Sequence, residues 1–273
     1  MSNHLAHTAP NTPQAKTRIA ICPPPHPPPP FPSPCPQRHG GAYALSIRNP
    51  KELANLEESW AGFVAAFAPH DPALFAEPGV AALGARLKAA AVGVSERVCP
   101  TPDDRWATLV HGDLKAMNVM LPSQPRDKDD EVEVGEGGEA MLIDFASAGV
   151  GLGVSDVAML LTHSVAPEDL ADGGEERLLD QYLNELDAAR GAAAVAASPY
   201  PRELARKHYR LAAIDYCRFV AGRFWRGATP AQFEARADSQ NTTLVNRSIP
   251  AALAFVRRVD KFLAEYESEV AAE

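Results

Sequence analysis

Two short polar motifs, each beside a short apolar run, constrain the fold of this 273-residue chain more than any other feature. The first, HGDLKAMN, spans residues 111–118 and follows the apolar run Trp106–Val110. The second, LIDFASAG, spans residues 142–149 and overlaps an apolar run at 140–145, while a third such run lies at 119–121. Short apolar runs bounded by polar residues predict strands. The sequence therefore predicts a small strand cluster around two polar loops.

Apolar residues at helical spacing dominate the chain on both sides of this strand cluster. One stripe runs from Leu53 to Phe67, and a second runs from Val80 to Val94. After Asp156 four further stripes follow, the last of them reaching Tyr266. Stripes at this spacing are typical of helices that pack one face into a core. We predict an α+β fold that is mainly helical, with the strand cluster holding the chemistry.

Two segments have compositions that disfavour a packed core. Residues 1–48 include CPPPHPPPPFPSPCP, a run whose prolines cannot donate backbone hydrogen bonds and favour extended polyproline geometry. Residues 124–139 are polar, acidic and glycine-bearing. We predict a disordered leader at 1–48, a helical segment at 49–105, and a region at 106–270 that carries a disordered acidic insertion at 124–139.

The leader leaves several interpretations open. It is either a semi-rigid spacer or a ligand for an SH3-like or WW-like module. Cys22, His26, Cys35 and His39 are spaced as zinc ligands can be, although proline runs rarely fold around a metal. The absence of acidic residues before Glu52 is typical of organelle transit peptides, whereas the prolines disfavour a targeting helix.

The overall composition disfavours several classes of protein. A formal net charge of -9 argues against a general nucleic-acid binder, because phosphates are neutralised by clustered lysine and arginine. No apolar run approaches the length of a membrane span. The four cysteines show no paired spacing, which indicates free thiols in a reducing compartment. We expect a cytoplasmic protein that has no membrane span and does not bind nucleic acid.

The two motifs carry residue types that suit phosphoryl transfer. Magnesium prefers oxygen ligands and takes one or two carboxylates together with substrate phosphates, which suits Asn118 and Asp144. The reaction also needs a carboxylate that orients or deprotonates the attacking hydroxyl, and Asp113 is the candidate for this role. Lys115 is either a contact to the transferred phosphoryl group or a solvated surface lysine.

The pattern resembles that of the aminoglycoside phosphotransferase and choline-kinase-like group, which includes ecdysteroid-kinase-like proteins. The motif of that group is HGD-x4-N, then IDF or IDW, then a glycine and an Asp-Leu-Ala-like tripeptide. These stand here as HGDLKAMN, as IDF at 143–145, and as Gly151 followed by DVA at 156–158. The resemblance is strongest over residues 100–225.

The resemblance implies a protein-kinase-like fold, represented mainly by its helical C-terminal lobe. It implies that Asp113 is the catalytic aspartate, that Asn118 and Asp144 hold magnesium, and that Asp156 braces the loop that carries Asp113. His111 is implied as a packing residue. The cosubstrate implied is ATP with Mg²⁺, and the partner implied is a small molecule with a hydroxyl that accepts the phosphoryl group.

One feature of such kinases is not recognisable in the sequence. Their fold places a glycine-rich loop and a strand lysine well before the catalytic aspartate. The only lysines before the first motif are Lys16, Lys51 and Lys88, and the pair Gly40 and Gly41 does not resemble a phosphate-binding loop. Three interpretations remain open: a truncated fragment of an active kinase, a divergent enzyme with a shortened lid, or an inactive pseudokinase that serves as a binding module.

The sequence does not specify the acceptor. Polar and aromatic residues of the helical half are candidates for a substrate pocket, and the alternative is that they are ordinary surface and packing residues. An acidic pocket would suit cationic amino or choline-like alcohols. The candidates are Glu203, Asp215, Tyr216, Trp225 and Arg226.

Overall fold

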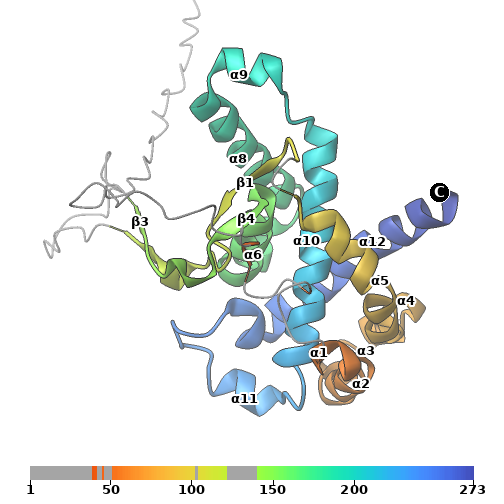
Figure 1. Ribbon diagram of the computed structural model, residues 1–273. Helices are drawn as coiled ribbons and strands as arrows, with labels where there is room; N and C mark the ends of the chain where they lie inside the picture. Colours follow the sequence, from red (N-terminus) through yellow and green to blue (C-terminus); the bar gives the residue numbers. More distant parts are fainter. Residues whose placement is uncertain (1–38, 42–44, 46–50, 102–103, 122–139) are drawn as a thin grey trace, which may run out of the picture. The chain divides into compact units, whose positions relative to one another are not determined.

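The computed structural model is mostly helical, with a few short strands (Figure 1). The chain forms two compact units, and the smaller one contains the strands β2 and β3 among its described residues. The predicted leader, apart from His39, Gly40, Gly41 and Leu45, and the acidic insertion lie outside the described residues, as does most of the zinc-like pattern. The structure describes residues 39–41, 45, 51–101, 104–121 and 140–273.

The larger unit contains the described helices, as the sequence stripes predict. Among the described residues, no helix is long and apolar enough to cross a membrane. The α-helices are α1 (Lys51–Ala54), α2 (Leu56–Phe67), α3 (Pro72–Ala76), α4 (Pro78–Ala81), α5 (Leu83–Val98), α6 (Gly153–Ser164), α7 (Pro167–Leu170), α8 (Gly174–Arg190), α9 (Ala192–Ala197), α10 (Arg202–Arg223), α11 (Pro230–Glu234) and α12 (Ile249–Ala272); the 3-10 helices are η1 (Ala68–His70), η2 (Ala116–Asn118), η3 (Phe145–Ser147) and η4 (Leu244–Asn246).

Side-chain caps set the beginnings of three of these helices. Asp71 accepts a hydrogen bond from a backbone N–H of α3, and Ser248 does the same for α12. Thr229 and Gln232 form a reciprocal capping box at the start of α11. Each helix also has a proline in its first turn, where the missing N–H costs no hydrogen bond. The sequence therefore fixes these boundaries locally.

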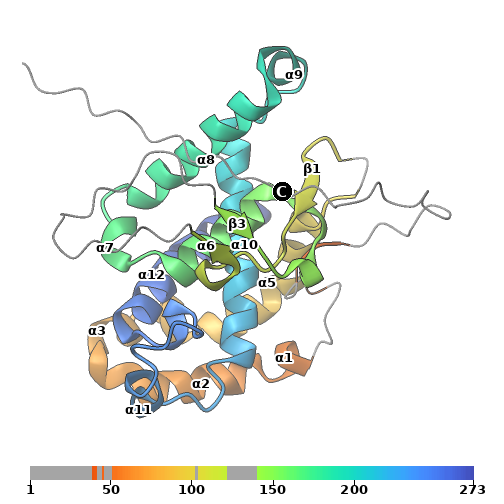
Figure 2. The ribbon, with the colours of Figure 1, turned by 90° about the vertical axis from the view of Figure 1, so that its left-hand side faces the viewer.

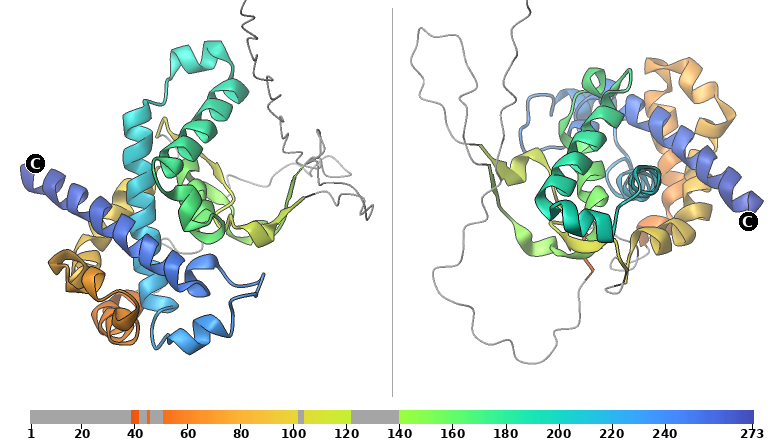
Figure 3. Two further views of the ribbon diagram at one scale, coloured as in Figure 1. Left: turned by 180° about the vertical axis from the view of Figure 1, so that it is seen from behind. Right: turned by 90° about the horizontal axis from the view of Figure 1, so that it is seen from above.

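Helix α10 is the centre of the larger unit. Every residue from Leu211 to Gly222 is buried, and α5, α6, α12 and α2 pack against it. Figure 2 shows α2 crossing one end of α10, and the right-hand view of Figure 3 looks almost along α10. The side chains of Asp215 and Arg218 are buried in this part of α10 and form an ion pair of 2.8 Å. Each charge therefore has a partner of opposite sign on the same helix.

Aromatic stacking joins α2 to the end of α10. The rings of Phe63 and Trp225 stack with centroids 4.3 Å apart, and Phe63 and Phe67 stack at the same distance. Trp60 packs on Phe63 and donates its indole N–H to the carbonyl oxygen of Val80 at 2.9 Å. The predicted stripe of α2 is thus core, although a turn at Asn55 separates it from α1.

The described residues form two short antiparallel strand pairs. In the larger unit, β1 (Ala107–Val110) pairs with β4 (Gly149–Leu152), with Val110 opposite Gly149. In the smaller unit, β2 (Val119–Met120) pairs with β3 (Met141–Leu142). The predicted strand at 140–145 is therefore shorter than expected, because the chain turns into η3 at Phe145. The sequence did not reveal β4, because its GVGL residues carry little strand preference.

Alanine substitutions at two helical glycines should have opposite effects on stability. A Cβ at Gly84 of α5 would lie 2.6 Å from the Cβ of Trp60, whereas a Cβ at Gly62 of α2 would meet nothing within 4 Å. Gly84→Ala should lower the free energy of unfolding by about 1–3 kcal/mol through overpacking. Gly62→Ala should raise it by about 0.5–1 kcal/mol through helix propensity. Urea unfolding measures both, and equal effects would contradict the packing described.

Candidate active site

The first polar motif follows β1 and includes η2, and we call it the HGD loop (residues 111–118). Gly112 has a φ of 77°, and a Cβ at this position would collide with the carbonyl oxygen of Ser147. Both the positive φ and the close approach require glycine. The sharp turn at Gly112 directs the loop away from β1 and leaves His111 buried behind it.

Asp156 binds the HGD loop from the first turn of α6. Its Oδ2 accepts the backbone N–H of His111 at 2.7 Å, and its Oδ1 accepts the N–H of Gly112 at 2.9 Å. Burial raises the pKa of Asp156, and the two N–H groups partly oppose that shift. A helix N-terminus also favours a negative charge. The two hydrogen bonds therefore tie the loop to the helical body at consecutive residues.

Asp113, Lys115 and Asn118 lie together in the HGD loop. The Nζ of Lys115 is 2.8 Å from Oδ2 of Asp113, and the side chains are 20% and 23% exposed. The amide nitrogen of Asn118 donates to the carbonyl oxygen of Asp113 at 2.8 Å. Asn118 is buried. Lys115 is thus a half-buried partner of the Asp113 carboxylate.

Asp144 follows the smaller unit directly and is exposed. Its φ of 63° and ψ of 61° place it in the left-handed region, which costs a residue other than glycine about 1–3 kcal/mol and is found most often at functional sites. The next residue, Phe145, packs its ring on His111 at a centroid distance of 4.8 Å. No described residue forms a hydrogen bond or ion pair with Asp144. This ring contact connects the segment that carries Asp144 to the HGD loop.

The donor atoms at this site fit magnesium. The amide nitrogen of Asn118 is engaged with the backbone of Asp113, so its amide oxygen is the atom left for a ligand. The Asp144 carboxylate is exposed. Magnesium takes one or two carboxylates plus water and phosphate oxygens, so it does not need a dense cluster of protein ligands. Within the part of the chain that is described, no group of three or more His, Cys, Asp or Glu could hold a metal ion.

The last turn of α6 also forms a hydrogen bond with the HGD loop, in addition to those of Asp156 in the first turn. Ser164 Oγ accepts the backbone N–H of Ala116 at 2.9 Å. The neighbouring His163 is buried, and its Nε2 forms a hydrogen bond with the hydroxyl of Tyr216. Burial, with a smaller effect from Lys115, lowers the pKa of His163 to about 3. The sequence motifs do not include these residues, although three consecutive polar residues at the end of an apolar helix were a signal.

A pocket of about 360 Å³ adjoins the Asp113–Lys115 pair. Residues of the HGD loop form one side of it, and the end of α10 and the segment between α11 and η4 form the rest. We call it the Lys115 pocket. Its lining residues are Lys115, Met117, Phe224, Arg236, Asn241, Thr242, Thr243 and Asn246.

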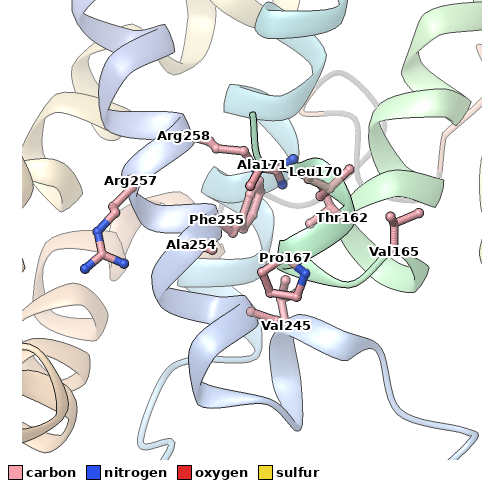
Figure 4. A pocket seen from close by; sticks show the side chains of 11 residues that line it. Thr162, Val165, Pro167, Leu170, Ala171, Val245, Ala254, Phe255, Arg257 and Arg258 are labelled. Carbon is pink, nitrogen blue, oxygen red and sulfur yellow. The ribbon is translucent and has the colours of Figure 1, made fainter. Parts of the chain in front are cut away.

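A second cavity, of about 230 Å³, lies between α6, α7 and α12 (Figure 4). Thr162, Pro167 and Phe255 line it, and in Figure 4 the Arg257 side chain points away from it. None of its described lining residues belongs to the HGD loop. The Lys115 pocket is therefore the better location for an acceptor.

The residues that sequence analysis proposed for the substrate pocket lie elsewhere. Asp215, Tyr216 and Trp225 are buried in the core, each at most 1% exposed. Glu203 is exposed and pairs with Arg206. These four residues are therefore packing or surface residues, as the alternative interpretation has it. Arg226 does not line the Lys115 pocket either. The pocket residues were missed because they come from loops and helix ends, where no periodicity marks them.

A helical body that braces an HGD loop beside an exposed, left-handed aspartate is the arrangement that the kinase-like resemblance implies. Residues 64–193, slightly less than half of the chain, match the model of the ecdysteroid kinase-like family, which is part of the aminoglycoside phosphotransferase and choline kinase-like group. The match confirms the resemblance, places this segment in the family, and covers both motifs. Comparison with curated proteins and with solved structures gave no significant match.

The buried His163 should make stability depend on pH. Its pKa is about 3 in the folded chain and near 6.5 when unfolded, so only the unfolded state binds this proton between those values, and stability falls as the pH drops below 6.5. From pH 7 to pH 5 this contribution is about 2 kcal/mol. His163→Gln should lose correspondingly less stability over that interval, measured by urea unfolding at both pH values. An identical loss in both proteins would contradict a neutral, buried His163.

Proposed function

We propose that this chain is an ATP-dependent phosphotransferase that acts on a hydroxyl group of a small molecule. The observation that carries the proposal is the Asp113–Lys115 ion pair of 2.8 Å beside the Lys115 pocket. The ecdysteroid kinase-like match supports the same class of reaction. The pocket offers room for an acceptor next to a carboxylate that can orient its hydroxyl.

Asp113 is the proposed base. An acceptor hydroxyl entering from the Lys115 pocket donates a hydrogen bond to the Asp113 carboxylate, and the proton passes to that carboxylate as the hydroxyl oxygen bonds to the γ-phosphorus of ATP. The bond from the γ-phosphorus to the bridging oxygen of ADP breaks in the same displacement. Lys115 lies within reach of the same carboxylate, so its charge can stabilise the transferring phosphoryl group.

Asn118 and Asp144 are the proposed magnesium ligands, through the amide oxygen of Asn118 and the carboxylate of Asp144. Bound magnesium would neutralise charge on the phosphates of the nucleotide. Asp156 and His111 act as positioning residues: Asp156 fixes the backbone of the HGD loop, and His111 packs against Phe145 beside Asp144.

A second candidate function is a binding module without catalysis. The observation that favours it concerns Gly40 and Gly41, whose backbone N–H groups donate to the carbonyl oxygens of Val150 and Ser147 at 2.8 and 3.0 Å. These N–H groups are engaged by the body of the protein, so they do not form a cradle for phosphates. In this alternative the HGD loop would be retained for its structural bonds alone.

Removing the Asp113 carboxylate tests the proposal directly. Asp113→Asn keeps the side-chain shape and should lower phosphoryl transfer by about 10²–10⁴-fold, because the proton acceptor is lost. The assay incubates the purified chain with magnesium, ATP and a panel of hydroxylated metabolites, and detects phosphorylated products by mass spectrometry. Product formation that does not differ between wild type and Asp113→Asn would contradict the role of Asp113.

Lys115→Met separates a role in the transition state from a role in nucleotide binding. If Lys115 stabilises the transferring phosphoryl group, turnover should fall by about 10²–10³-fold while the Kd for ATP stays the same. Lys88→Met is the matched control, because Lys88 pairs with Glu57 on the surface of α5 and should leave turnover unchanged. Unchanged turnover in Lys115→Met would remove the proposed role.

A further inference from the structure

We infer that the Lys115 pocket selects acceptors that carry an apolar face and no positive charge, and that Arg236 contributes to this selection. The inference rests on the proposed function, since it assigns the substrate class of the same site. Three features of the pocket lining support it: the charges of its side chains, its apolar surfaces, and the amide oxygen of Asn246, which has no hydrogen-bond partner among the described residues.

The charged groups of the pocket are cationic. Among its described lining residues, Lys115 and Arg236 are the ionisable side chains, and no aspartate or glutamate is present. The Asp113 carboxylate is already paired with Lys115, which lines the pocket. Arg236 is exposed and forms no ion pair with another described residue. A positively charged acceptor would therefore meet an unpaired guanidinium and no free carboxylate.

Two residues provide an apolar surface. Phe224 is 45% exposed although it is a large aromatic side chain. Its ring is held edge-on by Phe219 at a centroid distance of 5.4 Å, so it presents a fixed surface to the pocket. Met117 lines the pocket from the HGD loop, and a flexible thioether adapts to ligands of different shapes. These surfaces favour an acceptor with a hydrocarbon face.

Asn246 provides a polar atom that lacks a partner. The residue is buried, and its amide nitrogen donates to Thr243 Oγ1 at 2.7 Å. Its amide oxygen is buried without a hydrogen-bond partner among the described residues. Leaving a buried acceptor unsatisfied is unfavourable. A hydroxyl of the acceptor that donates to this oxygen would remove the penalty, so the pocket suits a molecule with more than one hydroxyl or with a hydroxyl and an acid.

Three compounds with the same body and different charge test this inference. They are 4-(hydroxymethyl)cyclohexanecarboxylate, 1,4-cyclohexanedimethanol and 4-(aminomethyl)cyclohexanemethanol, which share a ring and a primary hydroxyl and are anionic, neutral and cationic at pH 7. Saturation-transfer NMR without ATP gives the three Kd values for the full chain. The expected order is anion tightest and cation weakest, with about a two- to fivefold difference per step, as for a partly exposed charge pair.

Arg236→Glu should reverse this order, so that the cationic compound binds most tightly. Arg226→Glu is the matched control, because Arg226 is an exposed arginine outside the Lys115 pocket, and it should leave the order unchanged. Tightest binding of the cation to wild type, an order that Arg236→Glu does not alter, or no binding of any compound would each overturn the inference. Because these measurements need no phosphoryl transfer, the expected order without any phosphorylated product would sustain the pocket assignment and reject the proposed kinase activity.

Discussion

The candidate site depends on one carboxylate that accepts two consecutive backbone N–H groups. Asp156 holds His111 and Gly112 at 2.7 and 2.9 Å, and those residues begin the loop that carries Asp113. The strand pair holds the two partners of this contact together, because β1 leads into the loop and its partner β4 leads into α6, the helix of Asp156. A buried carboxylate with two such donors is satisfied, whereas removing it would leave two N–H groups without partners.

Helix α6 is held in place by its packing within the larger unit. Helix α6 packs against α10, whose buried charges, Asp215 and Arg218, are paired with each other. The last turn of α6 returns to the same loop through Ser164, so both ends of one rigid helix fix the HGD loop. The side chains of the candidate site, by contrast, face less crowded surroundings: Asp113 and Lys115 are half-buried beside a pocket, and Asp144 is exposed. The loop is thus supported by a rigid helix, while the side chains of the candidate site are accessible. Catalysis by proximity and orientation requires this combination.

The sequence predicted most of the helical core and the residues of the HGD loop, because both leave local signals. The stripe through Trp60 and Phe63 follows from periodicity, and Lys115 beside Asp113 follows from a short loop. The sequence did not predict β4, which is stabilised by its pairing with β1 and by the approach of Gly40 rather than by its own residues.

The Lys115 pocket is the clearest case of what a sequence alone cannot provide. Asp215 and Tyr216 are polar residues of a helix, and only the packing around α10 shows that they are buried. Phe224, Arg236 and Asn246 come from three separate segments without periodicity and meet only in the folded chain. The charged side chains among the described lining residues are Lys115 and Arg236, so this lining is not the acidic one that would suit cationic alcohols.

The proposed function requires that the HGD loop and Asp144 form a working site for magnesium and ATP. Isothermal titration calorimetry of the full chain with ATP, with and without magnesium, and of Asp144→Ala under the same conditions tests it most directly. We expect ATP binding that requires magnesium and is lost in Asp144→Ala. Absence of ATP binding by the folded wild-type chain, or binding that Asp144→Ala leaves intact, would contradict it.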